Sequence, residues 1–211
     1  MCRRRSIGSS CGKGCIITEE NMKKREDEEV ESAGLAGLVL DLQPKLLDSV
    51  AERNALAGSV ETFARCMTVL GVPLCLTEQV PDKLGPTEEG LLTVCGEAPC
   101  FPKDSFSAFG CGEFEEWISA NGVEHLLLSG IETPICVYLT AVDAVRRGMA
   151  VTVLVDCVGC RRAQDGEWAL RKMEKLGCHL LPLESLLYAI LKSAQHKEFR
   201  SISALVKERP S

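Results

Sequence analysis

Short apolar runs with β-strand character alternate along this chain with longer segments of helical periodicity, and this alternation limits the possible folds more than any other feature. Between the first two runs, Leu56, Val60 and Phe63 recur at steps of four and three, the spacing of one buried helix face, and Gly71 then supplies a helix stop. The pattern is typical of βαβ units around a parallel sheet, so we expect the α/β class with a mostly parallel sheet of six strands. The candidate strands are GLVLD (37–41), VPLCLTE (72–78), CFPK (100–103), EHLLLSG (124–130), AVTVLVD (150–156) and CHLLPL (178–183).

Helical periodicity predicts where the covering layers come from. Helices are expected over 114–121 and 134–148, and after Gln164 and Leu183. The C-terminal segment HKEFRSISALVKE (196–208) places its apolar residues on one helix face, so we expect it to pack against the domain.

The 211 residues fit one domain with a single core better than two. Residues 1–33 carry little periodic hydrophobicity and include the charged run KKREDEEVE, which predicts a disordered extension. The domain is therefore expected over residues 34–211. The opening MCRRRSIGSSCGKGC lacks the apolar stretch of a secretory signal, and a transit peptide is the alternative for this segment.

Composition and charge limit the classes of partner and the cellular location that we expect. A formal net charge of −6 offers no basic field for phosphate backbones, so no nucleic-acid partner is expected. No apolar run is long enough to cross a bilayer, so no membrane partner is expected either. Many of the 12 cysteines lie inside apolar runs, where Cys behaves as a small hydrophobe, and this usage indicates a reducing, cytoplasmic location.

Three reactive side chains fall where parallel strands end. Asp41 ends the first candidate strand, Lys103 ends the third, and Cys136 follows the fourth. Ligands of open parallel sheets bind at the carboxyl ends of the strands, so we expect these three residues to share one rim. Taken singly, each has a structural interpretation: Asp41 as a loop cap, Lys103 as a solvated charge and Cys136 as a core residue.

The position of Cys136 favours nucleophilic chemistry. Pro134 two residues earlier is suited to the first turn of a helix, so Cys136 is expected at a helix N-terminus, where the helix dipole favours a thiolate. Asp41 could take the thiol proton and return it to a leaving group, while Lys103 stabilises the charged forms of both partners. Backbone N–H groups of Glu132, Thr133 and Cys136 are the expected oxyanion hole.

Five segments resemble the isochorismatase-like cysteine hydrolases, and most closely the isochorismatase domain-containing subgroup. Three of them, LVLDLQ, FPKDSFSAF and SGIETPICVYLTAVDAVRRG, look like the signature segments of the superfamily, in its order. The loop LTEQVPDKLGPT and the C-terminal LESLLYAILKSAQHKEFRSISALVKE are similar to the subgroup. The resemblance runs from about residue 34 to residue 207.

This resemblance implies a Rossmann-like three-layer α/β/α fold and a catalytic triad of Asp41, Lys103 and Cys136. It also implies a non-proline cis peptide in the turn 131–133 and a homo-oligomer. Pro134 departs from the family, whose members often carry a polar residue there. The function implied is hydrolysis of a small carbonyl substrate, with a C–N amide-type bond best suited to a thiol nucleophile. The alternative is a non-catalytic binding or scaffold protein that retains the fold.

The remaining motifs are weaker. Gln43, Gln79 and Phe106 fall in loops expected to border the pocket and are predicted to contact the substrate. No metal and no cofactor are expected, because none of the three histidines lies in the loop VPDKLGPT, where the superfamily's nicotinamidases hold zinc. Cys157 and Cys160 form a CxxC pair, and whether they can form a disulfide is left open.

Overall fold

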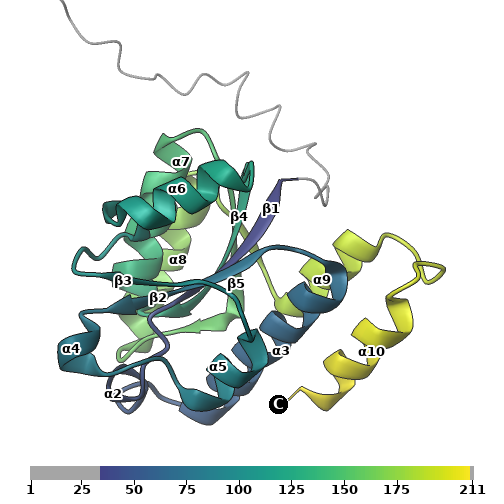
Figure 1. The fold of residues 1–211 in the computed structure, drawn as a ribbon, viewed down its shortest axis with the longest axis horizontal. Coiled ribbons are helices and arrows are strands. Elements are labelled where there is room, and N and C mark those ends of the chain that lie inside the picture. Colours follow the sequence, from purple (N-terminus) through teal and green to yellow (C-terminus); the bar gives the residue numbers. More distant parts are fainter. Residues whose placement is uncertain (1–33, 210–211) are drawn as a thin grey trace, which may run out of the picture.

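The computed structural model describes residues 34–209, so the predicted N-terminal extension (1–33) lies outside the described residues. Six strands form one sheet in the order β3-β2-β1-β4-β5-β6, and every neighbouring pair is parallel (Figure 1). The prediction of a six-stranded, mostly parallel sheet is confirmed, and the sheet is parallel throughout. The strands are β1 (Leu35–Leu40), β2 (Leu74–Gln79), β3 (Cys100–Lys103), β4 (His125–Ile131), β5 (Ala150–Gly159) and β6 (His179–Leu181).

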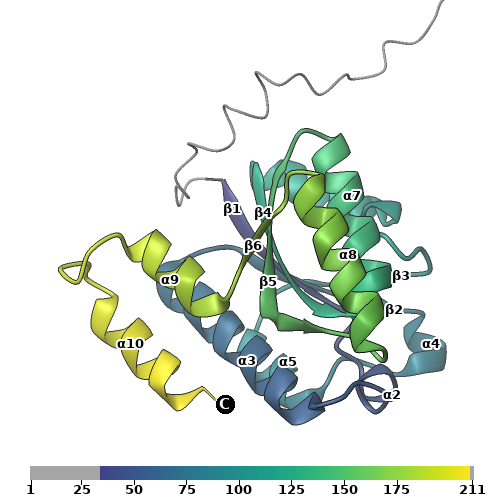
Figure 2. The ribbon, with the colours of Figure 1, turned by 180° about the vertical axis from the view of Figure 1, so that it is seen from behind.

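Helices cover both faces of the sheet and complete a three-layer α/β/α fold (Figures 1 and 2). One face carries α3 (Arg53–Leu70), α5 (Glu89–Cys95), α9 (Leu183–Leu191) and α10 (Phe199–Glu208). The other face carries α6 (Gly112–Ala120), α7 (Tyr138–Arg146) and α8 (Ala163–Lys175). Short helical turns lie in the loops: α2 (Pro44–Leu47), α4 (Pro81–Leu84), the 3-10 turn η1 (Ala108–Gly110) and the π-helical turn η2 (Thr133–Val137).

The central strand β1 shows why the sheet strands read as unbroken apolar runs. All six of its residues are buried. Leu35 and Val39 pack into the core beneath α3, whereas Leu38 and Leu40 pack into the core beneath α6 and α7. A parallel strand covered on both faces has no polar side, so its sequence does not alternate.

Two helix predictions are confirmed by the packing. Helix α3 ends at Gly71, whose φ of 68° is left-handed and whose N–H caps the carbonyl of Met67. At the C-terminus, α10 packs against α3 and α9, and Ile202 on its inner face is fully buried. Arg209 just beyond α10 forms an ion pair with Asp156 of β5 at 2.7 Å.

The helix predicted over 134–148 differs in its first turn. Its start is the π-helical turn η2, and the regular helix α7 begins only at Tyr138. Helix α5 was not predicted, because its seven residues are too few to show a clear period. Within residues 34–209, no helix is both long and apolar enough to cross a membrane.

Candidate active site

The carboxyl ends of four adjacent strands bring the predicted reactive residues together. Asp41 follows β1, Gln79 ends β2, Lys103 ends β3, and Cys136 lies in η2 after β4. Because the sheet order is β3-β2-β1-β4, these four positions are neighbours on one edge. This edge includes the switch point at which open α/β sheets bind their ligands.

Asp41 and Lys103 form a buried ion pair at the centre of this edge. Lys103 Nζ lies 2.7 Å from Asp41 Oδ2, and neither side chain is exposed. Asp41 has a φ of 52°, and its backbone N–H donates to the carbonyl of Thr77. A left-handed Asp immediately after a strand turns the chain sharply and leaves its carboxylate at the sheet edge. Removing one partner of such a pair typically costs about 3–5 kcal/mol, because the other charge is left buried and unpaired.

The Cys136 sulfur lies against this pair. Lys103 Nζ is 3.8 Å from Cys136 Sγ, and the thiol lies 3.9 Å from Gln79 Oε1. Cys136 is only 6% exposed. A thiol, a carboxylate and an ammonium group therefore meet in one water-poor site.

Burial first, and then the negative charge of Asp41, raise the pKa of the Cys136 thiol, which reaches about 12. Lys103 and the backbone N–H of Glu132 act in the opposite direction and lower this pKa. The expectation that this position favours a thiolate is therefore wrong, because burial and the charge of Asp41 outweigh the lowering of the pKa by Lys103 and the Glu132 N–H. A protonated thiol needs a base at the moment of attack, and the Asp41 carboxylate lies beside it.

Strand β4, which precedes Cys136, passes unusually close to β1 at Gly130. Gly130 has a φ of 104°, and a Cβ placed on it would lie 2.1 Å from the carbonyl oxygen of Leu40. Only glycine fits this position. One residue further along the chain, the peptide bond between Ile131 and Glu132 is cis, as the family resemblance implied.

The predicted oxyanion turn is held by the loop after β5. Arg161 Nε forms an ion pair with Glu132 Oε1 at 2.7 Å, and Thr133 Oγ1 donates to the carbonyl of Gly159 at 3.0 Å. Glu132 and Thr133 are both buried. These contacts fix the turn from its outer side, and the oxyanion role of its backbone N–H groups stays a prediction.

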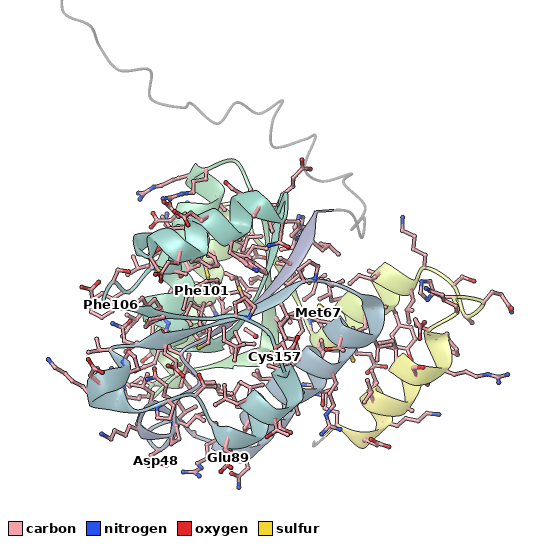
Figure 3. The ribbon with its side chains drawn as sticks, in the orientation of Figure 1. Asp48, Met67, Glu89, Phe101, Phe106 and Cys157 are labelled. Carbon is pink, nitrogen blue, oxygen red and sulfur yellow. The ribbon has the colours of Figure 1, made fainter. Side chains whose placement is uncertain are left out.

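The three residues predicted to contact substrate occupy different places. Gln43 is fully buried. Its side-chain amide accepts from the Gln79 N–H and donates to the carbonyls of Gln79 and Gly85. Gln79 Oε1 accepts from Lys103 Nζ at 2.6 Å. The ring of Phe106 is 56% exposed at the periphery of the molecule (Figure 3), while its carbonyl accepts from Lys103 Nζ at 3.4 Å. Substrate contact by Gln43 and Phe106 stays a prediction.

Thr77 is a site residue that sequence reasoning missed. Its hydroxyl donates to Asp41 Oδ1 at 2.7 Å and is fully buried. The signal in the sequence was a polar residue within the apolar strand VPLCLTE, two positions before Gln79. Residues two apart in a strand face the same side, so Thr77 and Gln79 point toward the same neighbours.

The weaker motifs can also be placed. Between residues 34 and 209, no group of three or more His, Cys, Asp or Glu side chains is arranged to hold a metal ion. Cys157 is buried within β5 beside α3 (Figure 3), where its thiol donates to the Ser59 carbonyl. Cys160 lies after the strand with its sulfur 3.2 Å from the Arg162 carbonyl, and both thiols are free.

Comparison with known proteins shows close relatives of this fold. The isochorismatase domain matches residues 36–185. Isochorismatase domain-containing protein 2A of Mus musculus is 34% identical over 168 residues, which cover 80% of each chain. A structure described as the MAR1 ribonuclease from Caenorhabditis elegans superposes with a TM-score of 0.81 at 27% identity, covering 87% of this chain and 95% of that one. The YcaC gene product of Escherichia coli, described as an octameric hydrolase of unknown specificity, has a TM-score of 0.81 at 20% identity, covering 86% and 90%.

Proposed function

This chain belongs to the isochorismatase family and has the fold of its hydrolases, and from this premise we propose that it is a cysteine hydrolase of a small carbonyl substrate. The bond cleaved is a C–N bond of amide type. Cys136 is the nucleophile, Asp41 the general base and acid, and Lys103 the residue that completes the triad. The observation that carries this proposal is the convergence of Cys136 Sγ, Lys103 Nζ and Asp41 Oδ2 in one buried network.

In the first half of the reaction, the substrate carbonyl carbon is attacked by Cys136 Sγ while the thiol proton passes to the Asp41 carboxylate. The S–C bond forms, and the electron pair of the C=O bond moves onto oxygen. The backbone N–H groups of the 132–136 turn stabilise this oxyanion, a contribution of about 3 kcal/mol per donor in well-studied sites. Asp41 then gives its proton to the leaving nitrogen, the C–N bond breaks, and a thioester remains.

In the second half, water attacks the thioester carbonyl and transfers a proton to Asp41. The S–C bond breaks, the acid product leaves, and the sulfur recovers its proton. Lys103 stays charged throughout. Its role is to stabilise the negative charge that moves between Asp41 and the sulfur. This electrostatic stabilisation is largest where water is excluded.

A substrate screen with a Cys136→Ala control tests this proposal. Amides, carbamates and ureido compounds are incubated with the full chain, and release of the amine or ammonia is measured. We expect at least one compound to be hydrolysed, and turnover to fall by about 10⁴-fold or more in Cys136→Ala, as for other covalent nucleophiles. The thioester is expected as a mass increase on the Cys136 peptide after acid quenching.

Hydrolysis that is equal in wild type and Cys136→Ala would contradict the proposal. No turnover of any compound would favour the alternative of a binding or scaffold protein. RNA oligonucleotides belong in the same screen, because the C. elegans neighbour is described as a ribonuclease. The proposal also includes a cytoplasmic location and a homo-oligomeric state. It includes no metal or cofactor, and no nucleic-acid or membrane partner.

A further inference from the structure

Gln79 differs from an ordinary pocket residue because every polar atom of its side chain is engaged within the site. Its Oε1 accepts from Lys103 Nζ at 2.6 Å, and its Nε2 donates to the Asp104 carbonyl at 2.9 Å. The donor bond to a carbonyl fixes which end of the amide is which, since a carbonyl cannot pair with Oε1. The oxygen of Gln79 therefore has to face Lys103.

The backbone of Gln79 is held just as firmly. Gln43 Oε1 accepts from the Gln79 N–H at 2.8 Å, and Gln43 Nε2 donates to the Gln79 carbonyl at 3.1 Å. The side-chain amide of Gln43 thus pairs with the end of β2 as a neighbouring strand would. Both glutamines are buried, so these bonds do not compete with water.

Lys103 has three N–H donors and needs a defined direction for each of them. Asp41 Oδ2 takes one at 2.7 Å and Gln79 Oε1 takes another at 2.6 Å. The third is left for the weaker contacts, which include Cys136 Sγ at 3.8 Å. Two short bonds at fixed angles therefore determine how the ammonium group faces the sulfur.

We propose that Gln79 is a positioning residue of the catalytic network: it aims Lys103 at the Cys136 sulfur and supplies a neutral acceptor where a second carboxylate would oppose thiolate formation. This inference rests on the proposed function and replaces the predicted substrate contact of Gln79 with a role exerted mainly through Lys103, whose bond to Gln79 Oε1 at 2.6 Å is much shorter than the 3.9 Å between Oε1 and the sulfur. A neutral acceptor matters because any added negative charge next to the sulfur favours the protonated thiol.

Alkylation of Cys136 by iodoacetamide tests this role without a known substrate. Rates are measured on the full chain between pH 7 and pH 10 by peptide mass spectrometry, which separates Cys136 from the other cysteines. Gln79→Glu keeps the size and the acceptor for Lys103, adds a negative charge and loses the donor to the Asp104 carbonyl, whereas Gln79→Met removes both polar atoms. We expect Gln79→Glu to slow alkylation about tenfold at each pH below 9, which corresponds to a shift of one pKa unit, and Gln79→Met to slow it by about three- to tenfold.

Ser129→Ala is the matched control. Ser129 is buried on β4, which β1 separates from β2, and its hydroxyl bonds only the Leu38 carbonyl in the described structure. Its loss therefore tests the effect of a missing buried hydrogen bond. We expect its alkylation to stay within about twofold of wild type at every pH, since it has no contact with Lys103. If Gln79→Met does not fold, as judged by circular dichroism, Gln79→Glu carries the test.

Wild-type alkylation profiles in both Gln79 variants would overturn the inference. With a substrate from the screen, the inference predicts that kcat falls about 10- to 100-fold while KM changes less than about twofold, whereas a substrate contact would raise KM and leave alkylation unchanged. Altered alkylation profiles without any hydrolysis would overturn the proposed function and leave the positioning role standing. Cys136-dependent hydrolysis with unaltered Gln79 variants would overturn the positioning role alone.

Discussion

At the scale of single residues, Thr77 makes a direct contact with the proposed base, Asp41. Its hydroxyl donates to Asp41 Oδ1, while Lys103 occupies Oδ2, so both carboxylate oxygens have a partner. A carboxylate held from both sides keeps one orientation toward the sulfur. Thr77 therefore contributes to the geometry of the site although it cannot itself exchange a proton at neutral pH.

Thr77→Val removes this hydroxyl with little change in shape. We expect kcat to fall about tenfold, because the base becomes free to rotate, and the free energy of unfolding to fall by about 1–2 kcal/mol. Steady-state kinetics on a screen substrate and urea titration measure the two effects. Thr152→Val is the control, because Thr152 is also fully buried but bonds His125 in the strands β4 and β5, away from Cys136. Equal kcat values in the two variants would argue against the role of Thr77.

The sequence predicted Asp41, Lys103 and Cys136 because each is a reactive residue placed where a strand ends. It could not predict that the side chain of Gln79 bonds Lys103, because that contact depends on the register in which β2 pairs with β3. The raised pKa of Cys136 was equally out of reach, because burial is a property of the packed site and not of the local sequence.

At the scale of elements, the C-terminal helix α10 completes the layer that contains α3 and α9. Its single fully buried residue, Ile202, lies in the same core as Leu187 and Phe63. The amphipathic pattern of the tail predicted this packing. Short elements such as α5 and the π-helical turn were not predicted, because their hydrogen bonding is set by neighbours and not by a repeating pattern.

Ile202→Ala measures how much α10 contributes to stability. We expect the free energy of unfolding to fall by about 2–4 kcal/mol, because the substitution leaves a cavity between α10 and α3. Ser201→Ala on the exposed side of the same helix should change it by less than about 0.5 kcal/mol. Denaturant unfolding followed by circular dichroism gives both values, and equal stabilities of the two variants would show that α10 is not packed as described.

At the scale of the whole molecule, buried thiols couple stability to alkaline pH. Burial raises the pKa of Cys66 and of Cys100 to about 12, and that of Cys75 and Cys157 well above the ordinary value of 9.0. Above pH 9 the unfolded chain loses these protons while the folded chain keeps them. The contribution of these thiols to the free energy of unfolding is therefore fully present below pH 9 and is lost as the pH rises toward 12.

Cys66 isolates one contribution to this loss, because its side chain lies on the inner face of α3 and is fully buried. Between pH 8 and pH 10 we expect the wild type to lose about 1.4 kcal/mol more stability than Cys66→Val, which has no thiol to ionise. Urea titrations at the two pH values measure this difference. The variant's own stability at pH 8 cancels in the comparison, and identical pH dependence in the two proteins would contradict a raised pKa of Cys66.

The architecture of the sheet was predictable as a class, but its strand order was not. Continuous apolar runs separated by helices define a parallel sheet, and the family resemblance supplied the Rossmann-like arrangement of layers. The local pattern does not show where the strand order reverses. Strands β2 and β3 add to one side of β1, and the chain then crosses back so that β4 pairs with the other side of β1. This reversal brings Cys136 next to Asp41.

The site takes its residues from the ends of several strands, and this affects how the protein is synthesised and how it could be divided into fragments. Asp41 and Lys103 are 62 residues apart in the chain, and Cys136 follows 33 residues later. During synthesis, the carboxylate of Asp41 emerges from the ribosome long before its counterion exists. If the polypeptide is cut between β3 and β4, one fragment holds Asp41 and Lys103 and the other holds Cys136. The proposed mechanism predicts that neither fragment is active by itself, and recovered activity on mixing the two would report reassembly of the whole sheet.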